Sequence, residues 1–334
     1  MKLSLMIPTF NSARTIERTL GSVLAQRHRP LEVVIYDEAS QDDTRAIVRR
    51  LLDAAELDRG ADRPERIDAR LMTSDTNSGP VKAWRVALHA ITGDWCAFVW
   101  SDDVLHADYS TAMMQGAARA TAAGRTLVAC TGAWEAGGET RAYYSDDKGV
   151  VSAVEFSEGM FMRRFPLTQI CAIYQTAAAR EVFDRHIQFD NPRGYDYNRH
   201  PYGNDVGYLS ELAQVGGGVE LLGERLVTLV DSGDSMTYRA TREHVWQMRW
   251  QYTFNQLRVW RWWDERGVPG ARRLRSMAER RLALCSLMLG GHGERLRPSN
   301  YLRGLQAYLD FRRFDYQRTQ YSLEEHRRRV SGHG

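Results

Sequence analysis

The chain has 334 residues, of which 43% are hydrophobic and 26% charged, a composition typical of a soluble globular protein with a sizeable core. This length suggests about two domains. The formal net charge of +3 is too small to indicate a nucleic acid as the main partner, so we expect none.

The positions of the cysteines and the lengths of the apolar runs indicate the cellular compartment in which the protein is expected. The four cysteines are far apart and form no CxxC pair, which argues against a zinc site or a disulfide framework and for a reducing compartment. The apolar run 3–7 is too short for a secretory signal, and no run approaches the ~20 residues that span a membrane. We therefore expect a cytoplasmic protein that at most lies on a membrane surface.

Strands and helices are predicted to alternate through the first hundred residues. Short apolar runs predict buried strands at 3–7, 31–36, 67–72 and 95–99. Apolar positions at helical spacing follow the first three runs, beginning at Ile16, Ala46 and Ala83. This order predicts a parallel α/β sheet.

A polar cluster follows each of these strands. The clusters are Pro8–Asn11, Asp37–Glu38, Asn77–Gly79 and Ser101–Asp103. Ligands of such sheets bind beyond the carboxyl ends of the strands, so the clusters predict one site. The chain has no GxxxxGK and no GxGxxG, so neither a P-loop nor a dinucleotide fold is indicated.

The adjacent carboxylates Asp102 and Asp103 have two interpretations. Hard oxygen ligands at the end of a strand suit a divalent cation that also holds phosphate oxygens. Alternatively, one of them only caps a helix that begins near Val104.

The run from Leu3 to Asp108 resembles the family 2 glycosyltransferases. The likeness is carried, in order, by Ile7–Asn11, Ser22–Gln26, Glu32–Ser40 with Asp42–Thr44, Asn77–Gly79, Gly93–Asp94 and Ser101–Asp103. It implies a GT-A-type, Rossmann-like domain over 1–240, with a mixed, mostly parallel sheet flanked by helices. Residues 1–108 would be the nucleotide-sugar half, 109–240 the acceptor half and 241–334 a helical C-terminal extension.

The resemblance also implies a donor site. Pro8, Thr9 and Asn11 would border the base and ribose, and Asp37 or Glu38 would accept a hydrogen bond from the base imide, which suits uracil. Asp102 and Asp103 would bind Mn²⁺ or Mg²⁺ and, through it, the diphosphate. The remaining nucleotide-sugar positions are Asn77, Gly79, Lys82 and Ser101.

Four positions near this site qualify the implied assignments. Glu38 stands where the family usually has Asp or Asn, and Trp100 stands where many members have the first Asp of the DxD element. Lys82 and Arg85 could neutralise diphosphate, or they could form only a solvated helix face.

The second half of the domain is expected to carry the acceptor chemistry. Strands are predicted near 127–131, 170–174 and 224–230, with an irregular loop or hairpin over 132–149. The resemblance implies that Asp205, at the start of a helix, is the base that takes the proton of the acceptor hydroxyl. Its alternative role is a helix cap. The substitutes for this base are Asp190, Asp196 and His200. The resemblance also makes Ser235 a candidate site residue, because the corresponding loop of the family often closes over the diphosphate.

Beyond residue 241 the pattern is helical. Five apolar residues recur at helical spacing: Trp246, Trp250, Phe254, Leu257 and Trp260. We expect this stripe to pack on the rest of the chain or on a second subunit, as in a homodimer. The alternative is a basic amphipathic helix on a membrane surface near a lipid-linked acceptor.

Together these observations predict a metal-dependent, inverting glycosyltransferase. It would move a sugar from a nucleoside-diphosphate donor, UDP-linked, to a saccharide or lipid-linked saccharide in cell-surface polysaccharide or glycoconjugate synthesis. The alternatives are a non-catalytic nucleotide-sugar binding protein and a nucleotidyltransferase. The expected location is the cytoplasm, with peripheral contact at the inner face of the cytoplasmic membrane as an option.

Overall fold

The structure is a computed structural model that describes residues 1–57, 67–136, 139–142, 144–186, 193–231 and 245–288. The chain divides into two compact units, residues 1–243 and 244–334. The candidate site lies in the first unit, which contains the sheet.

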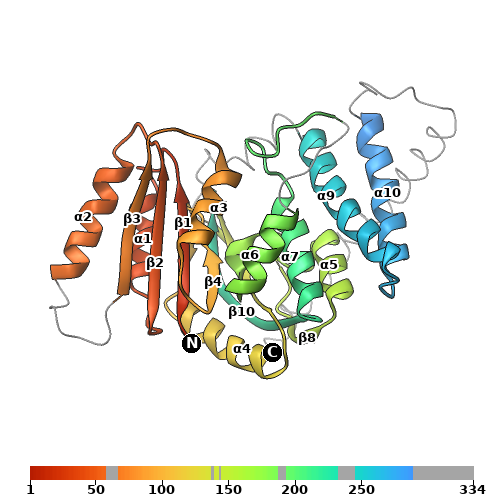
Figure 1. The fold of residues 1–334 in the computed structure, drawn as a ribbon, viewed down its shortest axis with the longest axis horizontal. Helices are drawn as coiled ribbons and strands as arrows, with labels where there is room; N and C mark the ends of the chain where they lie inside the picture. The colour runs from red at the N-terminus through yellow and green to blue at the C-terminus, as the bar shows by residue number, and fades with distance from the viewer. Residues whose placement is uncertain (58–66, 137–138, 143, 187–192, 232–244, 289–334) are drawn as a thin grey trace. The chain divides into compact units, whose positions relative to one another are not determined.

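A mixed sheet forms the centre of the first unit (Figure 1), with its main strands in the order β3-β2-β1-β4-β9-β6-β10-β5. β1 pairs in parallel with β2 and β4, and β2 pairs in parallel with β3. β9 runs antiparallel to both β4 and β6. The strands are β1 (Leu3–Thr9), β2 (Leu31–Glu38), β3 (Ile67–Ser74), β4 (Trp95–Phe98), β5 (Val104–Leu105), β6 (Leu127–Ala136), β7 (Glu139–Ala142), β8 (Lys148–Val151), β9 (Ala172–Gln175) and β10 (Val219–Val230).

Helices cover both faces of this sheet. Alternate residues of β1, namely Leu3, Leu5 and Ile7, join one apolar core with residues of α1, α2 and α4, while α3 packs on β1 and β2 from the other face. Because successive side chains of a strand point to opposite faces, those of β1 lie alternately in this apolar core and on the face that α3 covers. The helical elements are α1 (Ile16–Leu24), α2 (Thr44–Leu57), α3 (Pro80–Ala90), α4 (Tyr109–Ala122), α5 (Ala153–Phe161), the 3₁₀ turn η1 (Gln169–Cys171), α6 (Thr176–His186) and α7 (Asn204–Val215).

The alternation predicted for the first hundred residues is present, but the segment after Asp103 differs from one expectation. Val104 and Leu105 form strand β5, which pairs antiparallel with Thr228 and Val227 of β10. The next helix, α4, begins at Tyr109, with Asp108 at its N-cap position. Asp102 and Asp103 therefore cap no helix near Val104, because pairing with a strand more than 120 residues away decides the local backbone.

The segment 132–149 is more regular than a surface loop. β6 continues to Ala136 and pairs antiparallel with β7, so the hairpin interpretation is the one observed. β8 then pairs antiparallel with the start of β10. The four cysteines are all buried and free of disulfides.

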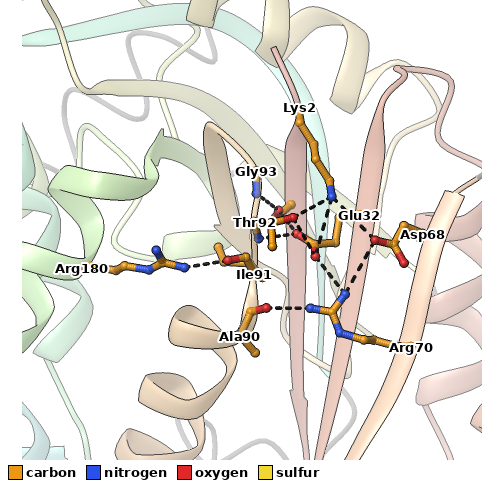
Figure 2. Close-up of polar contacts among 10 residues, drawn as sticks. Lys2, Glu32, Asp68, Arg70, Ala90, Ile91, Thr92, Gly93 and Arg180 are labelled. Atoms are coloured by element: carbon orange, nitrogen blue, oxygen red, sulfur yellow. Dashed lines mark hydrogen bonds and ion pairs between the residues drawn. The ribbon is translucent and has the colours of Figure 1, made fainter.

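A buried carboxylate ties together the amino ends of the parallel strands (Figure 2). Glu32 is fully buried and accepts hydrogen bonds from Ser4 Oγ, Thr92 N (2.7 Å) and Arg70 Nη1 (2.8 Å). Burial alone would raise the pKa of Glu32, but these hydrogen bonds outweigh it and lower the pKa. This cluster lies at the edge of the sheet opposite the carboxyl ends, so its role is structural.

Replacing Glu32 with Gln is expected to reduce the free energy of unfolding at pH 7 by about 1.5–3 kcal/mol, the usual worth of hydrogen bonds to a charged group. Because the folded-state pKa is lowered, this stability is present above the unfolded pKa and disappears as the pH falls through the folded pKa. Urea unfolding should therefore show a difference between wild type and variant that shrinks below about pH 4. Asp68→Asn, whose side chain is 62% exposed, is the control and should change little. A difference that stays constant on acidification would contradict this account.

The second unit contains two packed helices, α9 (Val245–Glu265) and α10 (Ala271–Met288). Three residues of the predicted stripe, Trp250, Leu257 and Trp260, are buried, so the stripe is not an open apolar face. Trp250 Nε1 donates a hydrogen bond to Ser286 Oγ of α10 at 3.0 Å. Within the described ranges, we found no helix with both the length and the apolarity needed to cross a membrane.

Candidate active site

The predicted polar clusters meet at the carboxyl edge of the parallel strands. Thr9 at the end of β1 pairs in register with Asp37 of β2, and Glu38 pairs with Ser74 of β3. Val99, just after β4, donates its backbone N–H to Met6 O of β1 at 2.8 Å. The segment that carries Asp102 and Asp103 therefore leaves the sheet beside the end of β1.

Backbone and side-chain hydrogen bonds tie the loops of this edge together. Asn11 has a left-handed backbone (φ 49°); its N–H donates to Ser40 Oγ at 2.8 Å, and its Oδ1 accepts from Gln41 N at 2.8 Å. Ser12 Oγ lies 2.8 Å from Ser101 Oγ. The loops after β1, β2 and β4 are thus one connected surface. Pro8 is half-buried beside it, and Thr9 is buried.

Asp37 is fully buried, and its two oxygens differ. Oδ1 accepts hydrogen bonds from Ser40 N (3.1 Å) and from Arg45 Nε, while Oδ2 is buried without a hydrogen-bond partner. A buried carboxylate oxygen without a donor is costly, so a ligand N–H placed there would be strongly favoured.

Glu38 is engaged differently from Asp37. Its Oε1 accepts the N–H of Ser78 at 2.8 Å, and it is 3% exposed. Burial raises the pKa of Glu38, against the opposing hydrogen bonds from the N–H groups of Ser78 and Gly79. Glu38 therefore holds the turn between β3 and α3.

That turn, Asn77–Gly79, precedes α3. Asn77 Oδ1 accepts Gly79 N at 3.1 Å, and Gly79 has φ +98°, a conformation in which a side chain would be strained. Lys82 is exposed on the first turn of α3. Arg85 is ion-paired with Asp184 of α6 at 2.7 Å, so its charge is already balanced within the protein.

The Asp102–Asp103 pair lies between β4 and β5. Asp103 is 6% exposed, and its Oδ1 accepts Val230 N from β10 at 3.0 Å. Burial raises the pKa of Asp103 well above the ordinary value, and the neighbouring charge of Asp102 adds to the shift. Burial also raises the pKa of Asp102, which is half-buried. The protein itself stabilises the charged forms of this pair poorly.

Two adjacent carboxylates in need of positive charge fit Mn²⁺ or Mg²⁺, which prefer oxygen ligands. In the part of the chain that the structure describes, no group of three or more His, Cys, Asp or Glu residues could hold a metal ion. A cation held by this pair would therefore leave coordination positions for ligands other than the His, Cys, Asp and Glu residues of the described ranges, such as diphosphate oxygens.

Trp100 stands where many members of the resembled family have the first Asp of the DxD element. Its ring stacks on Phe98 with centroids 5.8 Å apart, and its Nε1 donates to Thr168 Oγ1 at 2.8 Å. The indole therefore fixes the start of the Ser101–Asp103 segment by packing.

Asp205 lies in the first turn of α7, where the N-cap position is occupied by Gly203 with φ +82°. Asp205 is thus not the N-cap residue. Burial raises the pKa of Asp205 to about 7. A carboxylate that titrates near neutrality is suited to general-base chemistry at physiological pH.

Of the other candidate residues in this half, Asp196 and His200 make local contacts, and two lie outside the described residues. Asp196 Oδ1 accepts the N–H groups of Asn198 (2.9 Å) and Arg199 (3.3 Å) and so stabilises a turn. His200 stacks on Tyr202, with ring centroids 6.1 Å apart. Asp190 and Ser235 lie outside the described residues.

Two residues, Gln26 and Asn198, have structural roles that the local sequence does not indicate. Gln26, in one of the quoted motifs, donates to His106 O (2.9 Å) and accepts from Ser110 N (2.8 Å), so it holds the segment that follows the carboxylate pair. Asn198, which no motif singled out, contacts the turn between β3 and α3.

The chain belongs to the family described as "Glycosyl transferase family 2", whose pattern matches residues 4–186, more than half of the chain. The predicted GT-A-type α/β fold is likewise confirmed by solved structures. The Staphylococcus aureus TarS 1-349 structure in complex with UDP-GlcNAc aligns with a TM-score of 0.61 at 18% identity, covering 93% of this chain and 80% of that one.

Two further similarities concern donors and acceptors of other proteins. A mannosyltransferase from Pyrobaculum calidifontis in complex with GDP-Man and Mn²⁺ aligns with a TM-score of 0.50 at 18% identity, covering 99% of this chain and 88% of that one. The Escherichia coli UDP-Glc:alpha-D-GlcNAc-diphosphoundecaprenol beta-1,3-glucosyltransferase WfgD is 30% identical over 102 residues, covering 30% of this chain and 35% of WfgD. Such matches span only about a third of the length of the curated relatives.

Proposed function

We propose that this chain is a metal-dependent, inverting glycosyltransferase that moves a sugar from a UDP-linked donor to a saccharide or lipid-linked saccharide acceptor. The observation that carries the proposal is the gathering of Asp37, the Asn77–Gly79 turn and the Asp102–Asp103 pair at one edge of the sheet in a family 2 chain. The site chemistry follows from these groups.

Asp37 recognises the base. Its buried Oδ2 has no hydrogen-bond partner and can accept the imide N–H of uracil, whereas Glu38 is occupied by the backbone of Ser78. This difference favours Asp37 over Glu38 as the contact to the base. The TarS structure, which holds UDP-GlcNAc, supports a uridine donor on the same fold.

Asp102 and Asp103 hold Mn²⁺ or Mg²⁺, which when bound would offset the negative charge of the leaving diphosphate. Asp205 accepts the proton of the acceptor hydroxyl as the hydroxyl oxygen attacks the anomeric carbon. The bond from that carbon to the diphosphate oxygen breaks on the opposite face, and the configuration inverts. A base whose pKa is about 7 can take this proton at neutral pH.

The acceptor is a growing cell-surface saccharide or its lipid-linked precursor. Supporting this are the names of relatives, among them the diphosphoundecaprenol-directed WfgD and the succinoglycan biosynthesis protein ExoO of Rhizobium meliloti. An acceptor attached to a lipid would bring the enzyme to the inner face of the cytoplasmic membrane.

A thermal-shift panel of UDP-, GDP- and dTDP-sugars, with and without Mn²⁺, tests the donor assignment. At a concentration 100 times Kd a ligand stabilises the native state by about 2.7 kcal/mol, which corresponds to a shift of about 5–10 °C for a domain of this size. A shift that needs both a UDP-sugar and Mn²⁺ supports the proposal, and no response to any nucleotide would overturn it. Pyrophosphate release from a nucleoside triphosphate would indicate a nucleotidyltransferase instead, and metal-dependent binding without transfer or hydrolysis would indicate a binding protein.

A further inference from the structure

Asn198 lies in the segment between α6 and α7 and reaches back to the turn that precedes α3. Its Nδ2 donates a hydrogen bond to Ser78 O, and its Oδ1 accepts Lys82 N at 3.2 Å. These groups are separated by 116 to 120 positions in the chain. One amide side chain therefore spans the nucleotide-sugar half and the acceptor half.

The turn is shaped to receive this side chain. A Cβ atom added at Gly79 would lie 2.6 Å from Asn198 Nδ2 and 2.9 Å from Asn198 O, closer than real contacts allow. An amide of this length can donate to one backbone group and accept from the other at once. Aspartate has the same shape but no donor for Ser78 O.

The other side of the same turn is held from β2. Glu38 accepts the N–H of Ser78, the residue whose carbonyl accepts from Asn198. The turn is thus fixed between Glu38 and Asn198, so its position depends on both halves of the domain.

Asn198 is also linked to the start of α7. Asn198 N and His200 N both donate to Asp196, to its Oδ1 and its O respectively, at 2.9 Å each. Tyr202 N then donates to His200 O at 2.9 Å, and Asn204 N donates to Pro201 O at 3.1 Å, so a series of hydrogen-bonded turns leads from Asn198 to the start of the helix. Asp205 lies in the first turn of that helix. A shift of the Asn198 segment would therefore move Asp205 relative to the donor turn.

We propose that Asn198 is a positioning residue that couples the turn before α3 to the first turn of α7 and so sets where Asp205 stands relative to the donor. This inference rests on the proposed function for its catalytic consequence. The coupling itself is a property of the fold. Misplacement of a catalytic group by about 1 Å can cost 10²-fold in rate. We therefore expect the hydrogen bonds of Asn198 to affect kcat more than donor affinity.

The test compares Asn198→Asp and Asn198→Ala with Arg199→Ala, a control whose side chain is 73% exposed. With an active UDP-sugar, kcat should fall about 10- to 100-fold in both Asn198 variants, a larger factor than any rise in the donor KM, while Tm stays within about 2 °C. Arg199→Ala should match wild type. Wild-type kcat in Asn198→Asp, or a loss confined to donor KM or to Tm, would overturn the positioning role.

Hydrogen exchange separates this inference from the proposed function. In Asn198→Ala, which removes the side-chain acceptor of Lys82 N, the amides of Lys82 and Gly207 should both exchange faster than in wild type. Faster exchange at Lys82 alone would overturn the coupling, whatever the enzyme's activity. If wild-type protein turns over no sugar nucleotide, the proposed function fails, and the exchange result still decides whether the two segments are coupled.

Discussion

Replacing Asp205 with Asn is expected to lower kcat for sugar transfer by about 10²- to 10⁴-fold, the usual contribution of a positioned general base. Asparagine keeps the size of the side chain but cannot take the acceptor proton. Donor binding should be preserved, because Asp205 is not among the proposed donor-binding residues. Steady-state transfer kinetics with a donor binding assay measure both quantities.

The pH dependence of the wild-type enzyme follows from the same residue. Burial raises the pKa of Asp205 to about 7, so the carboxylate is protonated and inactive as a base below that pH. The value of kcat/KM should therefore rise with pH through about 7 and level off above it. Because the folded state favours the neutral form, Asp205→Asn should be at least as stable as wild type at pH 8, so lost activity would not reflect unfolding.

Asp196→Asn serves as the matched control for Asp205→Asn. Asp196 is exposed and stands eight positions before Asn204, the first residue of α7, and its carboxylate stabilises a local turn. Its variant should retain most of the transfer rate. If activity instead disappears in Asp196→Asn and survives in Asp205→Asn, the base assignment moves to Asp196.

Replacing Asp103 with Asn should remove the stabilisation that a UDP-sugar gives in the presence of Mn²⁺ and lower kcat/KM at least about 10²-fold. The amide oxygen can still accept Val230 N, so the variant should fold. It should also be no less stable than wild type without ligand, because burial disfavours the charged carboxylate. Thermal shifts across a Mn²⁺ titration measure the effect.

Asp108→Asn is the control for Asp103→Asn. Asp108 is five positions further along the chain, exposed, and ion-paired with Arg27 at 3.3 Å. Its variant should respond to donor and Mn²⁺ as wild type does. An unchanged Mn²⁺-dependent shift in Asp103→Asn would remove Asp103 from the metal site.

The central parallel strands and the polar clusters after them could be predicted because their signals are local. Leu3–Ile7 and Leu31–Tyr36 are continuous apolar runs that end at polar residues, and parallel pairing brings those ends to one edge. The apolar pattern did not predict the strand at Val104–Leu105, because this short strand forms by pairing with β10. The helices α4, α5 and α6 also had no prediction, since they lie between the motifs.

The sequence by itself determined the family, the alternating half of the sheet, and which carboxylates follow its strands. The tertiary structure alone decided what each group does with its neighbours: Glu38 holds a turn, Asp37 keeps a buried oxygen without a partner, and Arg85 is neutralised by Asp184. It also brought Asn198 to Ser78. The reason is physical: periodicity and turn chemistry are set within a few residues, whereas these contacts join groups that only folding brings together.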